Sequence, residues 1–144
     1  MKNLIIIFIV LAWSVSPVLA GEKTAAPAVK KILQTAPFTS QAPLGQWSDP
    51  RQQDGCEEAS PLMAVKWARG QTLTKAQALK EITGLSDWLL KKYGEYRDIS
   101  SADTVNWIIK DYFGHQNVAL KKNATAEDII NEIKKGQVVI APMN

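Results

Sequence analysis

Cys56 is the only cysteine in the chain, and it stands in the segment QQDGCEEAS (residues 52–60), where a loop is expected to become a helix. A thiol at the start of a helix is a candidate nucleophile. The unpaired backbone N–H groups there, together with the helix dipole, favour the thiolate and lower the pKa of the thiol. A free cysteine is also a small hydrophobe that is often buried, so its position alone leaves a structural role open.

A cysteine nucleophile needs a base that takes its proton and later protonates the leaving group. His115 is the only histidine of the chain, and it follows Gly114 in a polar turn, residues 114–117. A histidine in such a turn is typical of a solvated loop. We favour that interpretation of His115 over a catalytic base.

The other polar residues indicate neither a metal site nor a surface for nucleic acid. No group of His, Cys and carboxylate residues has the spacing of metal ligands, and no glycine-rich loop could hold a phosphate. The formal net charge is +3, of which Lys2 accounts for one, and no basic run is interleaved with aromatic residues. We therefore expect no metal, no cofactor and no nucleic-acid partner.

Amphipathic segments predict a series of helices around the cysteine. The expected helices cover residues 56–69, 74–82, 85–93, 101–112 and 125–135, with N-terminal caps at Thr74, Ser101 and Thr125. The first is expected to start close to Glu58, because Pro61 is tolerated only in a first helical turn. Its expected buried residues are Ala59, Leu62, Met63 and Trp67. Before this helix, the prolines and glycines of residues 37–50 predict an ordered loop with Trp47 exposed.

Two later segments predict strands. Val118 and Leu120 alternate with polar residues in 117–121, and residues 137–142 form a short apolar run after Gly136. Helices followed by strand, helix and strand predict an α+β domain. Because a sheet of two strands is marginal, we expect the domain to be incomplete at the C-terminus, with further strands beyond residue 144.

The N-terminal part of the chain has the pattern of an exported protein. Residues 1–20 combine a positive Lys2, an apolar stretch and small residues before Gly21, which predicts a signal peptide. Residues 21–36 predict a linker, and residues 37–144 the domain. The apolar stretch is short for a membrane span. We therefore expect a secreted or extracytoplasmic protein without a stable span after cleavage; an uncleaved membrane anchor is the alternative.

The segment that leads into the cysteine resembles a known family. Its residues are PFTSQ (37–41), Trp47, DGCEEAS (54–60) and Met63. They resemble the papain-fold cysteine peptidases related to the bacteriocin-processing domains that cleave double-glycine leaders. The resemblance continues through residues 67–70, 92–94, 103–104 and 111–113, and it covers most of the chain from 37 to 142. It implies a papain-like α+β fold, of which this chain would hold the N-terminal helical part and the first strands.

The resemblance also implies a catalytic site. Cys56 would be the nucleophile, and a glutamine amide would be the side-chain donor to the oxyanion, beside the backbone N–H of Cys56. Gln41 matches the family's position best, Gln53 is the alternative, and Gln52 is the least favoured. The family takes its histidine, and the Asp or Asn that orients it, from a part of the domain after the position of Pro142, which this sequence does not contain.

The function expected from these observations is that of an exported cysteine peptidase-like protein. It would hydrolyse peptide bonds of a peptide or protein substrate through the Cys56 thiolate and an acyl-enzyme. An amidase or transferase with the same thiol chemistry is a second enzymatic possibility. The alternative from another class is a non-catalytic exported module that binds peptide or cell-wall material. Because the His and Asp part of the site is missing, we expect no peptidase activity from the chain as written.

Overall fold

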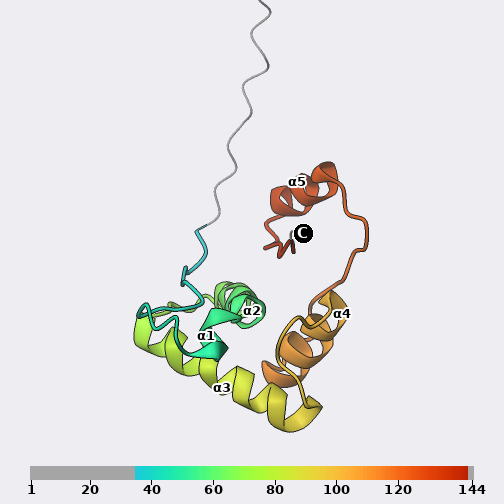
Figure 1. Cartoon of the computed structure of the whole chain (residues 1–144). Helices are drawn as coiled ribbons and strands as arrows, with labels where there is room; N and C mark the ends of the chain where they lie inside the picture. Colours follow the sequence, from blue (N-terminus) through green and yellow to red (C-terminus); the bar gives the residue numbers. More distant parts are fainter. Residues whose placement is uncertain (1–34, 143–144) are drawn as a thin grey trace, which may run out of the picture. The chain divides into compact units, whose positions relative to one another are not determined.

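A computed structural model describes residues 35–142 of the chain, so the predicted signal peptide and nearly all of the predicted linker lie outside the described residues. The elements, in chain order, are α1 (Pro50–Gln53), α2 (Cys56–Ala68), α3 (Lys75–Tyr93), α4 (Ser101–Asp103), the π-helix η1 (Thr104–Tyr112) and α5 (Ala126–Lys134). Helix α4 continues directly into η1 (Figure 1).

The predicted α+β class is wrong for the described part of the chain, which is all-helical. Residues 117–121 and 137–142, both expected to be strands, have no strand assignment, and residues 35–142 contain no sheet. An alternating or apolar run makes a segment suitable for a strand, but a strand forms only where another backbone completes its hydrogen-bond ladder. Val138 and Ile140 are half-buried without such a ladder. The papain-like sheet is therefore absent from residues 35–142.

Helix α3 is one continuous helix rather than the two predicted around residue 84. Thr74 caps it as expected, because its hydroxyl accepts from the backbone N–H of Gln77 while the Gln77 side chain reaches back to Thr74. Gly84 is exposed within the helix and costs it only about 1 kcal/mol relative to Ala. The residues that α3 buries recur at helical spacing on both sides of that glycine; they are Ala78, Ile82, Leu85, Ser86 and Leu89.

Helix α2 begins at Cys56, as expected, but Pro61 lies inside it rather than in its first turn. Proline has no N–H, so this position cannot donate to the carbonyl one turn earlier. The face that α2 buries also differs from the predicted one, since Met63 and Trp67 are only half-buried. The buried residues are Glu58, Ala59, Pro61, Leu62, Ala64 and Val65.

The core is centred on α3, which contacts α1, α2 and η1 (Figure 1). One cluster joins Ala59 and Leu62 of α2 to Ile82 of α3. The other joins Leu85 and Leu89 of α3 to Ile99 and Ile108. Burial of the Leu and Ile side chains, at about 1.5–3 kcal/mol each, is the main force that holds the helices together.

Helices α4–η1 and α5 begin close to where the sequence predicted. Ser100, one residue before the expected cap, accepts from the N–H of Asp103 and starts α4. Thr125 and Asp128 form the expected capping box of α5, which has no fully buried residue. Among the helices of residues 35–142, none has both the length and the apolar character needed to cross a membrane.

Candidate functional site

A sharp corner between α1 and α2 positions Cys56. Asp49 caps α1 by accepting from the N–H of Arg51 at 3.0 Å, and Pro50 occupies the first helical position. The sequence analysis missed this short helix, although an Asp-Pro step is a signal for a helix start. At the corner stands Gly55, where an added Cβ would lie 2.6 Å from the carbonyl oxygen of Arg51 and 3.2 Å from Cγ2 of Ile82. Only a glycine lets the two helices approach so closely.

Cys56 is exposed and is the first residue of α2, as the sequence predicted. The expected lowering of its pKa is wrong. Partial burial, followed by the charge of Glu57, raises the pKa of the thiol, although hydrogen bonds from the backbone act in the opposite direction. Glu57 and Glu58, in the first turn of α2, interact favourably with the helix dipole. Their charges also disfavour a thiolate at Cys56. The site thus presents an accessible thiol with a raised pKa.

Gln41 lies against this corner, whereas the other two glutamines differ in their roles. Nε2 of Gln41 donates to the carbonyl oxygen of Gln53 at 2.6 Å, and its Cβ lies 3.6 Å from the position that a Cβ on Gly55 would take. An amide has two donor protons, so one remains after the bond to Gln53. The side chain of Gln52 is fully buried, which removes it as an oxyanion donor. Gln53 is exposed and holds Gln41 through its backbone.

The loop between α3 and α4 is fastened to the start of α2 by two charged contacts. Nε of Arg97 lies 3.0 Å from Oδ2 of Asp54, two residues before the thiol. The backbone N–H groups of Asp98 and Ile99 donate to the carboxylate of Glu57, which favours its charged form. Burial and the charge of Asp98 outweigh these bonds and raise the pKa of Glu57. These contacts surround Cys56 with acidic side chains.

Glu58, two residues after the thiol, is fully buried. Its Oε1 lies 2.9 Å from the hydroxyl of Ser86 in α3, and its Oε2 has no hydrogen-bond partner among the described residues. Burial raises the pKa of this carboxyl to about 7. Glu58 lies in the first turn of α2. Its spacing from Leu62 and Val65, one and two turns further along α2, places it on the buried face.

The hydrogen bonds of His115 do not bring it beside Cys56. Its backbone N–H donates to the carbonyl of Ile109 at 2.9 Å, and its Nε2 lies 3.1 Å from the carbonyl oxygen of Asn117. Arg69, just after α2, donates to the carbonyl of Phe113 and ties the end of η1 to the C-terminal end of α2. Cys56 is at the other end of that 13-residue helix, about 20 Å along its axis.

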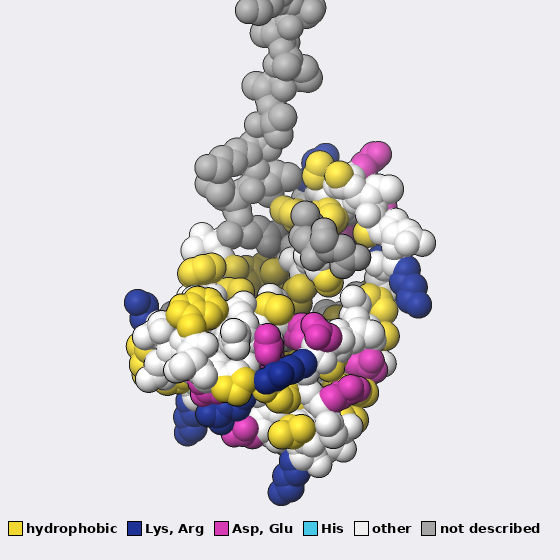
Figure 2. All heavy atoms as spheres, in the orientation of Figure 1, with side chains coloured by type: hydrophobic (Ala, Val, Ile, Leu, Met, Phe, Trp, Pro, Cys, Tyr) yellow, Lys and Arg dark blue, Asp and Glu magenta, His cyan; other side chains and the backbone are white. Residues whose placement is uncertain are grey.

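The surface next to the corner carries apolar side chains. Phe38, Leu44 and Trp47 are 82%, 54% and 53% exposed in the segment before α1. Trp47 is exposed as the sequence predicted. Figure 2 shows hydrophobic side chains interspersed with charged ones on the face in view (Figure 2). Exposed aromatic side chains of this kind can bind a peptide by apolar contact.

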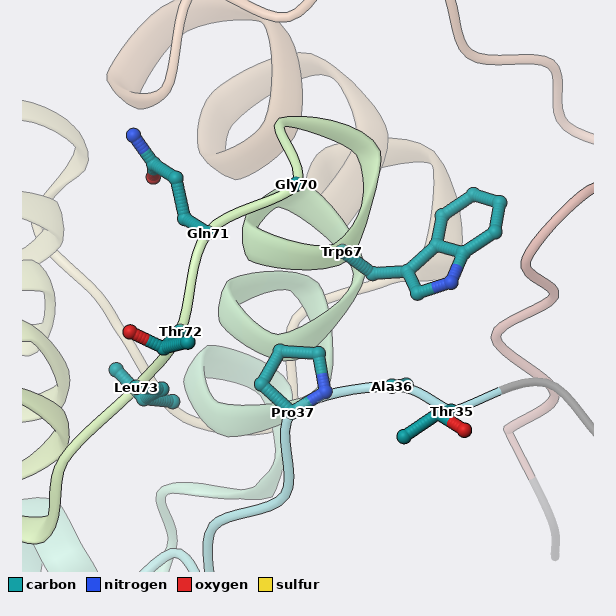
Figure 3. A pocket seen from close by; sticks show the side chains of 8 residues that line it. All are labelled: Thr35, Ala36, Pro37, Trp67, Gly70, Gln71, Thr72 and Leu73. Atoms are coloured by element: carbon teal, nitrogen blue, oxygen red, sulfur yellow. The ribbon is translucent and has the colours of Figure 1, made fainter.

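An open groove of about 480 Å³ lies away from the thiol. Residues 35–37, Trp67 and residues 70–73 line it, at the C-terminal end of α2. In Figure 3 the side chain of Gln71 points away from Pro37 and Trp67 (Figure 3). Neither Cys56 nor Gln41 contributes to this groove.

The described site therefore consists of a thiol, one amide donor and a set of carboxylates. In residues 35–142, no three side chains of His, Cys, Asp or Glu are grouped so that they could hold a metal ion. Comparisons of the chain with family models, with curated proteins and with solved structures found no match.

Proposed function

We propose that Cys56 is the nucleophile of a thiol-dependent enzyme that acts on the amide bonds of peptides or proteins. The observation that carries the proposal is the position of the thiol, which is exposed at the first residue of α2. The side chain of Gln41 lies against the preceding glycine. The similarity of residues 37–63 to the bacteriocin-processing peptidases supports the same roles for these two residues.

In the proposed reaction the Cys56 thiolate attacks the carbonyl carbon of the substrate and forms a C–S bond. The carbonyl oxygen becomes an oxyanion, which the remaining N–H of Gln41 and the backbone N–H of Cys56 would stabilise. Collapse of this intermediate breaks the C–N bond, and the amine leaves with a proton taken from water, since the described residues place no general acid beside Cys56. Water then hydrolyses the thioester and restores the thiol. Because residues 35–142 place no base beside Cys56, we expect this chain to form an acyl-enzyme only from activated esters.

The test is to measure acyl transfer from p-nitrophenyl acetate to Cys56, because this ester needs no protonation of its leaving group. Gln41→Ala should slow acylation at least tenfold, since an oxyanion donor contributes about 10²–10³ in rate. Gln46→Ala, an exposed glutamine of the same segment, is the matched control and should not change the rate. Cys56→Ser should abolish the acetyl adduct detected by mass spectrometry.

Alkylation by iodoacetamide separates an oxyanion donor from a residue that merely supports the fold. Alkylation of a thiolate develops no oxyanion, so Gln41→Ala should leave its rate unchanged. Equal slowing of acylation and alkylation in Gln41→Ala would show that Gln41 only supports the corner. That result would remove the catalytic assignment of Gln41.

The second candidate is a non-catalytic module that binds peptide through its exposed apolar side chains. The raised pKa of Cys56 favours it, because a protonated thiol is a poor nucleophile. The exposure of Phe38 and Trp47 supplies a surface for apolar contact. Acylation of Cys56 no faster than that of a free thiol in solution would favour this candidate over the enzyme.

A further inference from the structure

A buried polar contact joins α2 to α3 two residues after the exposed thiol. Glu58 and Ser86 are both fully buried. The hydroxyl oxygen of Ser86 lies 2.9 Å from Oε1 of Glu58 and 3.1 Å from the carbonyl oxygen of Ile82. The second carboxyl oxygen of Glu58 has no partner among the described residues.

The number of protons decides how these groups can be connected. A hydroxyl has one proton and can donate it to one acceptor at a time. If Ser86 donates to the carbonyl of Ile82, as a serine within a helix commonly does, its short contact with Glu58 requires a proton on the carboxyl. If Glu58 is ionised, Ser86 must turn towards it, and the other carboxylate oxygen is left buried without a donor. An ionised group with an unpaired oxygen is the costlier state.

The charges on the surrounding elements do not compensate an ionised Glu58. The elements around Glu58 carry charged side chains, which include Asp49 and Arg51 of α1, Asp54, Glu57, Glu81 and Asp87 of α3, Arg97, Asp98, and Lys110 and Asp111 of η1. Asp54 and Glu57 both disfavour its charge. Arg51 pairs with Asp49 at 2.8 Å and with Asp87 at 2.9 Å. Arg97 pairs with Asp54, and Asp111 pairs with Lys92.

We propose that Glu58, Ser86 and the carbonyl of Ile82 form a proton-dependent link between α2 and α3. In the protonated state, Glu58 donates to Ser86 and Ser86 donates to Ile82. Loss of the proton turns the Ser86 hydroxyl towards Glu58 and leaves a buried charge with Ser86 as its one side-chain donor. This link lies in the first turns of the helix that begins at Cys56, so it holds the thiol's helix against α3. The proposal does not depend on the function proposed for Cys56.

The link makes the stability of the domain sensitive to pH near neutrality. The pKa of Glu58 is raised from 4.5 to about 7 in the folded protein, so the folded state binds this proton more tightly than the unfolded state does. The stabilisation is therefore fully present below pH 4.5 and is lost as the pH rises through 7.

The first test is carbon-13 NMR of the Glu58 carboxyl in the full chain, which needs no variant. The expected titration midpoint lies near 7, and Ser86→Ala should raise it, because the ionised carboxylate loses the hydroxyl that donates to it. A midpoint at or below that of an ordinary glutamate would overturn the proposal. So would a midpoint that Ser86→Ala leaves unchanged.

The second test is thermal unfolding between about pH 5 and pH 9, where the melting temperature of the wild type should fall by about 10 °C. The melting temperature of Glu58→Gln should fall less than that of the wild type over this range, because the amide donates to Ser86 at every pH. Glu95→Gln, which removes an exposed carboxylate from the loop before α4, is the matched control and should keep the fall. An equal fall in Glu58→Gln and in the control would contradict the link.

Discussion

Helices α3 and α5 begin in the same way, yet they lie in very different surroundings. Each starts with a threonine whose hydroxyl accepts from the backbone N–H three residues later, and each has a reciprocal side-chain bond. Helix α3 then buries five residues, whereas α5 buries none completely. The difference shows that caps and amphipathic spacing decide where a helix forms, while its share in the core depends on the surfaces around it.

The chemical groups divide between the same two regions. Cys56, Gln41 and Glu58 belong to the part of the chain that packs around α3, with Ile82 touching the corner at Gly55. His115 belongs to the segment after η1, in which residues 114–142 form one helix and connecting loops. The thiol thus stands in the region packed around α3, and the one histidine of the chain stands in the other. The comparison between the two regions can be tested by matched substitutions.

The largest expected difference comes from removing aliphatic side chains. Leu85→Ala should lower the free energy of unfolding by about 3 kcal/mol, because it leaves a cavity in the core around α3. Ile130→Ala in α5, where the side chain is 46% exposed, should lower it by less than about 1 kcal/mol. Urea unfolding of both variants measures the two values. Similar losses would mean that α5 is as much a part of the cooperative core as α3.

A smaller effect is expected at two glycines, Gly55 and Gly84, and substitution by Ala should change the stability in opposite directions. Gly55→Ala should destabilise the protein by about 2 kcal/mol, because its Cβ would lie 2.6 Å from a backbone oxygen. Gly84→Ala should stabilise it by up to about 1 kcal/mol, since the nearest atom, the hydroxyl oxygen of Tyr112, would be 4.0 Å away. Thermal melting of the pair checks the prediction. If Gly55→Ala is tolerated as well as Gly84→Ala, the close α1–α2 corner is not needed to position Cys56.

The smallest expected effect concerns the two caps. Thr74→Ala should lower the free energy of unfolding by about 1 kcal/mol, because α3 and the core unfold together. Thr125→Ala removes an equivalent cap, but it should weaken α5 locally and change global unfolding by less than about 0.5 kcal/mol. Hydrogen exchange of the α5 amides, compared with denaturant unfolding, separates local from global loss. An equal global loss in both variants would contradict the division of the molecule.

The sequence alone predicted the start of α2 at a lone thiol, the caps of α3 and α5 and the exposure of Trp47. Each of these features depends on residues within one or two turns of each other. The sequence analysis was wrong where the outcome depends on distant parts of the chain. Ile82 and Leu85 pack against different clusters on either side of Gly84, so α3 continues through it. Residues 117–121 and 137–142 have strand-like patterns but no partner backbone.

The same division applies to the candidate site. The sequence by itself determined that one thiol stands at a helix start with glutamines before it and glutamates after it. Only the tertiary structure decided that Gln52 and Glu58 are buried and that Gln41 reaches the corner. It also decided that the pKa of the thiol is raised rather than lowered. A cap is a bond between close neighbours, whereas Glu58 meets Ser86 across 28 residues. Burial and charge at such a site are properties of the packed helices and not of any one segment.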